Sequence, residues 1–220
     1  MLPGLISLIF FIIEFVFLIF IILKNRSHPQ FVWIVLLIIF LQVYQLMEFL
    51  MCVGVSPNVI GRLGLVSITF LPPLGVLLAA DVINLKHWVN WVGILCGFAL
   101  SFYYLIVPNA FDLQTCNPFY AVYTYPLGNL YGIFYFGFIG WALILIGIGW
   151  IVNNKQKRKY MSKKATLVLV GYLSFLLPMA ITVVVDFSTS SAVPSIMCKY
   201  ALLLATTLLI FSFQHERETK

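Results

Sequence analysis

This sequence has very little charge. Only 9% of its 220 residues are charged, against about 25% in an ordinary soluble domain, while 62% are hydrophobic and the mean hydropathy is +1.05. One soluble core cannot bury so many apolar side chains. The composition therefore predicts a multi-pass integral membrane protein whose main partner is the lipid bilayer.

Residues typical of catalytic and metal sites are also scarce. The three histidines, His28, His87 and His215, map to the cytoplasmic edge of the predicted helices, which argues against a zinc hydrolase inside the bundle. No G-x-S-x-G motif is present, and the four cysteines have no zinc-site spacing. We predict no catalytic residue and no metal site, and the sequence identifies no cofactor.

Seven apolar runs are long enough to cross about 30 Å of hydrocarbon as helices. They cover residues 2–23, 31–54, 60–84, 88–107, 127–153, 165–185 and 193–213. Continuous rather than alternating hydrophobicity favours helices over barrel strands. The prediction is an all-α, seven-helix transmembrane bundle that forms a single domain over residues 1–220. No basic residue precedes the first run and no small-residue cleavage site follows it, so it is predicted to be a retained helix.

Basic residues predict the orientation of the bundle. Eleven of the thirteen fall on one side of the predicted membrane, the exceptions being Arg62 and Lys199. The positive-inside rule then places the N-terminus outside and the C-terminus in the cytoplasm, in a cell or cytoplasmic membrane. The same rule explains the net charge of +6 without a nucleic-acid partner.

Polar residues inside the membrane are concentrated in the stretch LQVYQLMEFLMC, residues 41–52. At about 100° per residue, Gln42, Gln45, Glu48 and Cys52 fall within one stripe of about 120°. Glu48 lies about 9 Å below the outer end of its helix, and Lys199 has the same depth in the last span. These two residues can therefore form an ion pair if their helices touch.

Several interpretations of this cluster stay open. It is a satisfied ion pair that fixes the order of the helices, or a site for a small solute, ion or proton used in transport or sensing, or a lone Lys199 that extends to the outer interface. An intramembrane lipid-modifying enzyme and a structural subunit of a membrane complex are the alternative functions. The predicted binding residues are Gln42, Gln45, Glu48, Ser195 and Lys199, with Glu14, Cys52, Cys198 and Asp186 as secondary polar residues.

Two of these secondary residues have open roles. Glu14 lies near the middle of the first span, where it is either a proton or ion ligand or a protonated carboxyl bonded to a neighbouring helix. Cys198 maps to the outer side together with Cys52 and Cys116. One disulfide among these three is compatible with an oxidising outer side, but spacing does not fix the pairing.

Three further patterns predict local structure. Pro72 and Pro73 should kink or break the third span. The long loop over residues 108–126 is rich in tyrosine and phenylalanine, which either lie in the headgroup belt or cap an outward cavity. Six glycines in the fifth span, at positions 128, 132, 137, 140, 147 and 149, are typical of a helix that packs closely against others.

The polar motifs resemble those of an uncharacterised family of bacterial and giant-virus seven-helix membrane proteins. The similarity lies in Q-x-x-E in the second helix, at Gln45 and Glu48, in Pro-Leu in the third, and in S-x-W-C near the start of the last, at Ser195 and Cys198. This chain has Met197 in place of the usual tryptophan, and Lys199 in place of an aromatic residue. The resemblance implies that the second and seventh helices act together, and it implies no activity.

Overall fold

Seven segments of the described chain are long and apolar enough to cross a membrane. The computed structural model describes residues 3–24, 30–85, 88–108, 110–155, 159–185 and 192–218. The candidate spans are Leu5–Leu23, Phe31–Cys52, Pro57–Val82, Trp88–Ile106, Gly128–Val152, Lys164–Thr182 and Val193–Phe211. The all-α, seven-helix prediction is therefore confirmed, and the chain is a multi-pass membrane protein.

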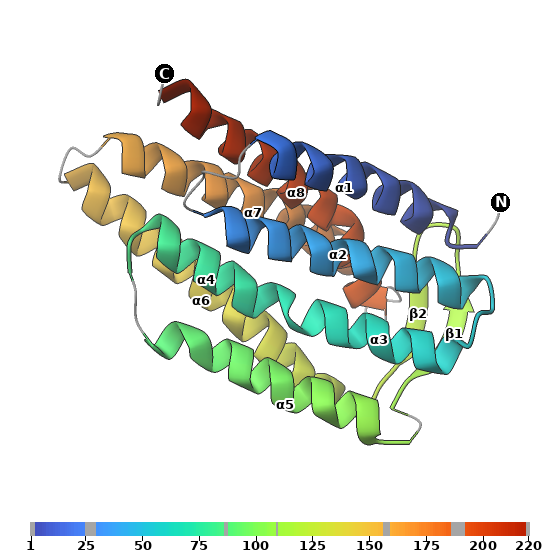
Figure 1. The fold of residues 1–220 in the computed structure, drawn as a ribbon. Coiled ribbons are helices and arrows are strands. Elements are labelled where there is room, and N and C mark those ends of the chain that lie inside the picture. The colour runs from blue at the N-terminus through green and yellow to red at the C-terminus, as the bar shows by residue number, and fades with distance from the viewer. Residues whose placement is uncertain are drawn as a thin grey trace.

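The spans form one elongated bundle (Figure 1). Its helices are α1 (Leu5–Lys24), α2 (Phe31–Cys52), α3 (Pro57–Thr69), α4 (Leu71–Val82), a short 3₁₀ turn η1 (Trp88–Trp91), α5 (Val92–Ile106), α6 (Gly128–Lys155), α7 (Lys159–Val185) and α8 (Val193–Glu218). The last three extend beyond their predicted spans. Helix α1 begins and α8 ends at opposite ends of the bundle. Which end faces the cytoplasm stays a prediction from the basic residues.

The third predicted span is two helices rather than one. Helix α3 ends at Thr69 and α4 begins at Leu71, with Phe70 between them. Pro72 and Pro73 occupy the first turn of α4, where a missing backbone N–H costs nothing because no carbonyl of the same helix would accept it. The predicted break is confirmed, and it falls immediately before the prolines.

The loop between α5 and α6 contains a β-hairpin that the sequence analysis did not predict. Strand β1 (Asp112–Cys116) pairs antiparallel with β2 (Ala121–Thr124), and the register is irregular between Leu113 and Thr115. The hairpin lies at one end of the bundle, below called the hairpin end (Figure 1). Phe111 and Tyr123 are buried, so these aromatic residues pack onto the helices instead of lying in a headgroup belt.

Helix α6 packs less tightly than its glycines predict. Among the described residues, nothing lies within 4 Å of the position that a Cβ would occupy at Gly132, Gly137, Gly140 or Gly147. The close-packing prediction is wrong at these positions, because this face of α6 is open. Gly149 does pack closely, against Ile83.

Candidate functional site

Glu48 of α2 and Lys199 of α8 form an ion pair at the hairpin half of the bundle. Lys199 Nζ lies 2.7 Å from Glu48 Oε1, and the side chains of Lys199 and Glu48 are 0% and 1% exposed. Helices α1, α2 and α8 contact one another in pairs around them. The equal depth predicted for the two residues therefore corresponds to a contact.

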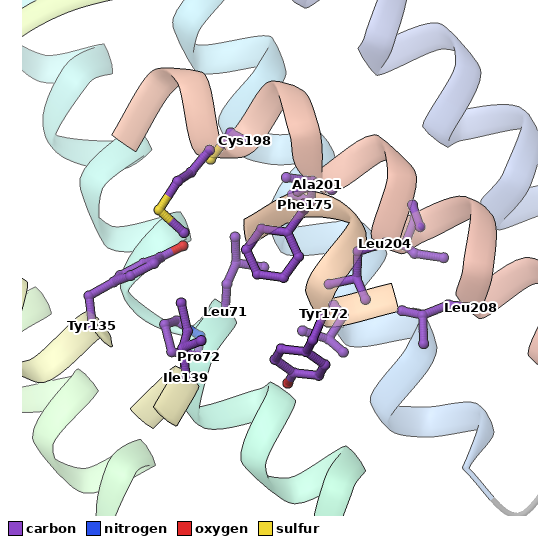
Figure 2. A pocket seen from close by; sticks show the side chains of 15 residues that line it. Leu71, Pro72, Tyr135, Ile139, Tyr172, Phe175, Cys198, Ala201, Leu204 and Leu208 are labelled. Carbon is purple, nitrogen blue, oxygen red and sulfur yellow. The ribbon is translucent and has the colours of Figure 1, made fainter. Parts of the chain in front are cut away.

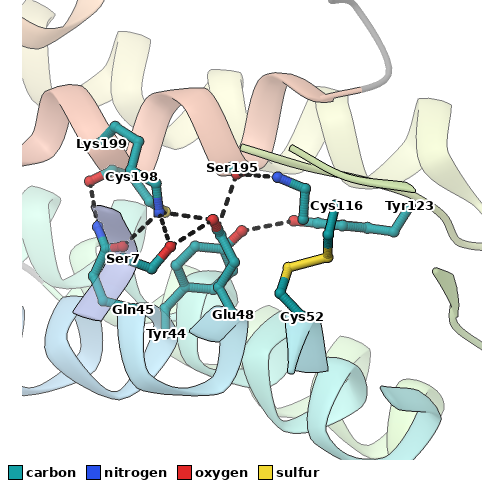
Figure 3. A network of polar contacts seen from close by, with 11 residues as sticks. Ser7, Tyr44, Gln45, Glu48, Cys52, Cys116, Tyr123, Ser195, Cys198 and Lys199 are labelled. Carbon is teal, nitrogen blue, oxygen red and sulfur yellow. Dashed lines mark hydrogen bonds and ion pairs between the residues drawn. A yellow bond between two sulfur atoms is a disulfide. The ribbon is translucent and has the colours of Figure 1, made fainter. Parts of the chain in front are cut away.

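Neighbouring groups satisfy both charges. Lys199 Nζ also donates hydrogen bonds of 2.7 Å to Ser7 Oγ of α1 and to Gln45 Oε1 of α2, so all three of its protons are used. Glu48 accepts from Ser7 Oγ and from Ser195 Oγ, each at 2.9 Å. Figure 3 shows these side chains converging between α1, α2 and α8. Ser7, Gln45, Glu48, Ser195 and Lys199 are below called the Glu48 network.

The donors and acceptors of the Glu48 network are matched to one another. Each serine hydroxyl donates to Glu48 and accepts from another donor: Ser7 Oγ from Lys199, and Ser195 Oγ from the backbone N–H of Ala121 at 3.0 Å. Gln45 also donates a hydrogen bond of 2.9 Å from Nε2 to the Cys198 carbonyl, so both the oxygen and the nitrogen of its amide group have partners. In this arrangement every donor and acceptor named above has a partner.

Three contacts attach the hairpin to this region (Figure 3). The Ala121 N–H bonds Ser195, the Tyr123 and Tyr44 hydroxyls are 3.2 Å apart, and a disulfide joins Cys52 at the end of α2 to Cys116 of β1. The disulfide is one of the three pairings that the sequence left open. Burial raises the pKa of the Tyr123 hydroxyl, so this group stays a neutral hydrogen-bonding partner at physiological pH.

The other predicted polar residues lie elsewhere. Gln42 is deeper than the Glu48 network and donates a long 3.5 Å bond to the Phe11 carbonyl. Cys198 is a free, buried thiol. Glu14 is fully buried, and neither of its carboxyl oxygens has a hydrogen-bond partner among the described residues. The predicted alternative, a carboxyl hydrogen-bonded to a neighbouring helix, is therefore not observed among these residues. Asp186 lies outside the described residues.

Ser7, Tyr44 and Tyr123 take part in these contacts but were not predicted. Ser7 precedes Glu14 by seven residues, which places both on one face of α1 at about 100° per residue. This seven-residue spacing could have identified Ser7 as a polar residue on the same face of the first helix as Glu14. The pairing of Tyr44 with Tyr123 depends on the hairpin, so no spacing within one helix could reveal it.

Three cavities lie near these residues or further along the bundle. The hairpin-end cavity, about 350 Å³, lies between β2, α6 and α8 and is lined by Tyr123, Thr124, Tyr125, Gly128, Tyr131, Gly132, Tyr135, Phe136, Val193, Pro194 and Met197. The central cavity, about 50 Å³, has mainly apolar walls that include Leu71, Phe175, Cys198 and Leu208 (Figure 2). Tyr135 and Met197 line both. A third cavity, about 400 Å³, has Trp33, Trp88 and Trp91 among the residues that line it. Glu48 and Lys199 line none of the three.

The described residues include no group of three or more histidine, cysteine, aspartate and glutamate side chains placed to hold a metal ion. The thiol of Cys52 is bonded to Cys116, so it is no metal ligand in this state. Chemically, the Glu48 network can hold helices and hairpin together, whereas the hairpin-end cavity offers room for a ligand. A scan against protein-family models and a search of curated proteins find no match for this chain, so the family resemblance stays a prediction.

Proposed function

We propose that this membrane protein binds a small molecule in the hairpin-end cavity, for transport or sensing. The observation that carries the proposal is the cavity itself. Its volume of about 350 Å³ lies within the range typical of small-molecule sites, roughly 300–1,000 Å³. It adjoins the Glu48 network through the first turns of α8, where the lining residues Pro194 and Met197 flank Ser195.

The walls of the hairpin-end cavity indicate the chemistry of the ligand. Rings of Tyr123, Tyr125, Tyr131 and Tyr135 follow one another with centroids 6.0, 5.4 and 5.8 Å apart, which forms a continuous aromatic wall. Among the described residues, none that lines the cavity is charged. Such a wall favours a neutral molecule with a ring or hydrocarbon body and a few hydrogen-bonding groups.

The position of the cavity supports a role in transport or sensing. Tyr135 and Met197 separate it from the central cavity, so displacement of the flexible Met197 side chain would join the two. Val193 and Met197 lie on α8, the helix that also carries Ser195 and Lys199. A ligand that moves the start of α8 would therefore act on the Glu48 network.

The alternative of a lipid-modifying enzyme has less support in the geometry. Both carboxylate oxygens of Glu48 are engaged by Ser7, Ser195 and Lys199, and none of the three cavities reaches Glu48. No observation favours this carboxylate as an acid or base. A structural subunit stays an alternative, and it predicts that no ligand depends on the hairpin-end cavity.

The experiment fills the cavity without moving the backbone. Gly132 lines the cavity and has nothing within 4 Å of its Cβ position among the described residues, so Gly132→Leu places a side chain into the space. Gly137→Leu is the matched control, because Gly137 lies on the same helix with equal room but does not line the cavity.

Purified protein in nanodiscs is titrated with a panel of aromatic alcohols, fatty alcohols, monoacylglycerols and sterols, and thermal shift and saturation binding are measured. We expect at least one compound to bind the wild type and the Gly137→Leu variant, and to lose binding at least tenfold in Gly132→Leu. Equal binding to all three proteins, or none across the panel, would contradict the proposal.

A proton is a second candidate for transport, and Glu14 is the observation that favours it. Its carboxyl is fully buried and has no hydrogen-bond partner among the described residues. Burying an unpaired carboxylate costs far more than burying the neutral acid, so we expect Glu14 to carry its proton. Proton flux is measured in liposomes that contain a pH-sensitive dye, and we expect it to be lost in Glu14→Gln. Asp112→Asn is the control, because it also removes one carboxyl but at an exposed position of the hairpin, and we expect it to keep the flux. Equal flux in the two variants would rule out Glu14 as the proton carrier.

A further inference from the structure

The third cavity lies away from both the Glu48 network and the hairpin-end cavity. Its walls come from the start of α2, the second half of α4, the segment that follows α4, and η1: Trp33, Leu77, Ala80, Asp81, Leu85, Trp88, Asn90 and Trp91. Its volume is about 400 Å³. It is below called the tryptophan cavity.

Three of the five tryptophans of the chain line this one cavity. Trp33 and Trp91 meet edge to face, with ring centroids 5.9 Å apart and planes at 71°. Trp88 is 72% and Trp91 is 51% exposed. Tryptophans of a headgroup belt need no common cavity, whereas these rings come from α2 and η1 and line the same space.

Besides the indole rings, whose N–H groups are hydrogen-bond donors, the tryptophan cavity is lined by two residues with acceptor oxygens, Asp81 and Asn90. Asp81 is partly buried at the end of α4, and no described residue donates a hydrogen bond to its carboxylate. Asn90 donates from Nδ2 to the Leu85 carbonyl at 3.1 Å, which leaves its Oδ1 as an acceptor. Among the described residues, no lysine, arginine or histidine lines the cavity.

Indole faces carry negative potential, and so does a carboxylate. A cation placed over several indole rings gains a cation–π interaction with each, and tryptophan gives the strongest of these. Aromatic walls favour a weakly hydrated, methylated ammonium over a small inorganic cation, because the methylated group loses less hydration on entering them.

We propose that the tryptophan cavity is a binding site for a methylated ammonium group, held by the faces of Trp33, Trp88 and Trp91 and by the charge of Asp81. The site is independent of the ligand proposed for the hairpin-end cavity. The ammonium group comes from the choline headgroup of a neighbouring lipid or from a free organic cation. Both present the same chemistry to the cavity.

The test uses the full chain in phosphatidylglycerol nanodiscs, which contain no ammonium lipid, with empty nanodiscs as the blank. Tetramethylammonium chloride is titrated against potassium chloride at equal ionic strength, and tryptophan fluorescence and calorimetry report binding. We expect saturable binding of tetramethylammonium and at least tenfold weaker binding of potassium. Equal responses to the two cations, or no saturation, would overturn the proposal on the wild-type protein alone.

Variants then locate the site. Asp81→Asn and Trp91→Leu should each weaken tetramethylammonium binding about 5- to 30-fold, the factor that a cation–π or charge contact of this type supplies. Trp150→Leu is the matched control, because Trp150 is partly exposed on α6 and does not line the cavity, and we expect it to change binding less than about twofold. Equal affinity in all three variants would place the cation elsewhere and overturn the proposal.

Nanodiscs of a second lipid show whether the bound ammonium group comes from a lipid headgroup or from a free organic cation. In phosphatidylcholine nanodiscs a bound headgroup competes, so tetramethylammonium binding should weaken at least fivefold in the wild type. Unchanged affinity supports the site with a free organic cation as its ligand, and competition supports it with the lipid headgroup.

Discussion

The ion pair between Glu48 and Lys199 predicts strong coupling between two substitutions. In Glu48→Gln, Lys199 keeps Ser7 and Gln45 as acceptors but loses the carboxylate with which it forms an ion pair. In Lys199→Met, the carboxylate keeps two serine donors and no cation. Removing one partner of a buried pair leaves an uncompensated charge, and we expect each single variant to lose about 3–5 kcal/mol of unfolding free energy.

The double variant should be much less damaged than the sum of the singles. It carries no buried charge in the Glu48 network, and its remaining cost is the unpaired hydrogen-bonding capacity of Ser7 and Gln45, about 1–3 kcal/mol. The coupling energy is therefore expected to be about 3 kcal/mol or more.

Reversible unfolding in mixed micelles, followed by tryptophan fluorescence, gives the free energies for the cycle. Arg62→Met is the control, because its contact with Asn58 is exposed, and we expect a change within about 1 kcal/mol. Additivity of the Glu48→Gln and Lys199→Met effects to within about 0.5 kcal/mol would show that the two charges do not stabilise each other, and would refute the proposed arrangement.

Three further predictions concern the hairpin and the orientation. A Cβ at Gly61 would collide with the ring of Phe111, so Gly61→Ala should lower the midpoint of thermal unfolding and cost roughly 1–3 kcal/mol, whereas Gly140→Ala, with open space, should not. The disulfide between Cys52 and Cys116 closes a loop with a sequence separation of 64, and its reduction should cost up to about 4 kcal/mol and shift the mobility of the protein in a non-reducing gel. The glycosylation sequon that begins at Asn25 lies outside the described residues, and the predicted orientation places it in the cytoplasm. It should therefore stay unmodified in a microsomal glycosylation assay, while a sequon engineered between β1 and β2 should be modified. The reverse result would show that the predicted orientation is inverted.

Much of the bundle could be predicted because the bilayer restricts what a chain can do. A span needs about 20 apolar residues and must satisfy its backbone internally, so the seven runs identified the seven spans. Helix ends were less predictable. Helices α6 and α7 continue into the lysine-rich segment between them, since lysine is a good helix former outside the membrane as well.

Contacts between helices were predictable only where two residues shared a rare property. Glu48 and Lys199 are charged residues at one depth in hydrocarbon, so each needed the other. Ser7 is small and common in membrane helices, and its role depends on how α1 rotates against α2 and α8. Likewise, the glycines of α6 predicted close packing, but whether a small residue faces a neighbour or an open surface is a tertiary property.

The hairpin was not predicted because aromatic residues in a headgroup belt and aromatic residues packed onto the bundle look alike in sequence. Tyrosines next to a membrane span are typical of the headgroup belt, and β1 and β2 are too short for a clear alternating pattern. Only the burial of Phe111 and Tyr123 distinguishes a hairpin that packs on the bundle from a loop that lies in the interface. The sequence kept a cavity capped by this loop as one of two alternatives, but it could not identify the walls that β2, α6 and α8 provide.

Helix α8 connects the satisfied ion pair to the proposed ligand site. Ser195 and Lys199 lie about 40° apart on the face toward α1 and α2, while Met197 lies about 160° from Lys199, on the opposite face toward the hairpin-end and central cavities. Where the flexible Met197 side chain does not give way to a ligand, the ligand pushes α8 toward the Glu48 network, whose hydrogen bonds are already 2.7 to 2.9 Å long. The network would resist this displacement or break as a unit, because leaving one member unpaired exposes a buried charge. A binding event at the hairpin-end cavity would thus have two discrete outcomes rather than a graded one, which is the property that both a sensor and an alternating transporter require.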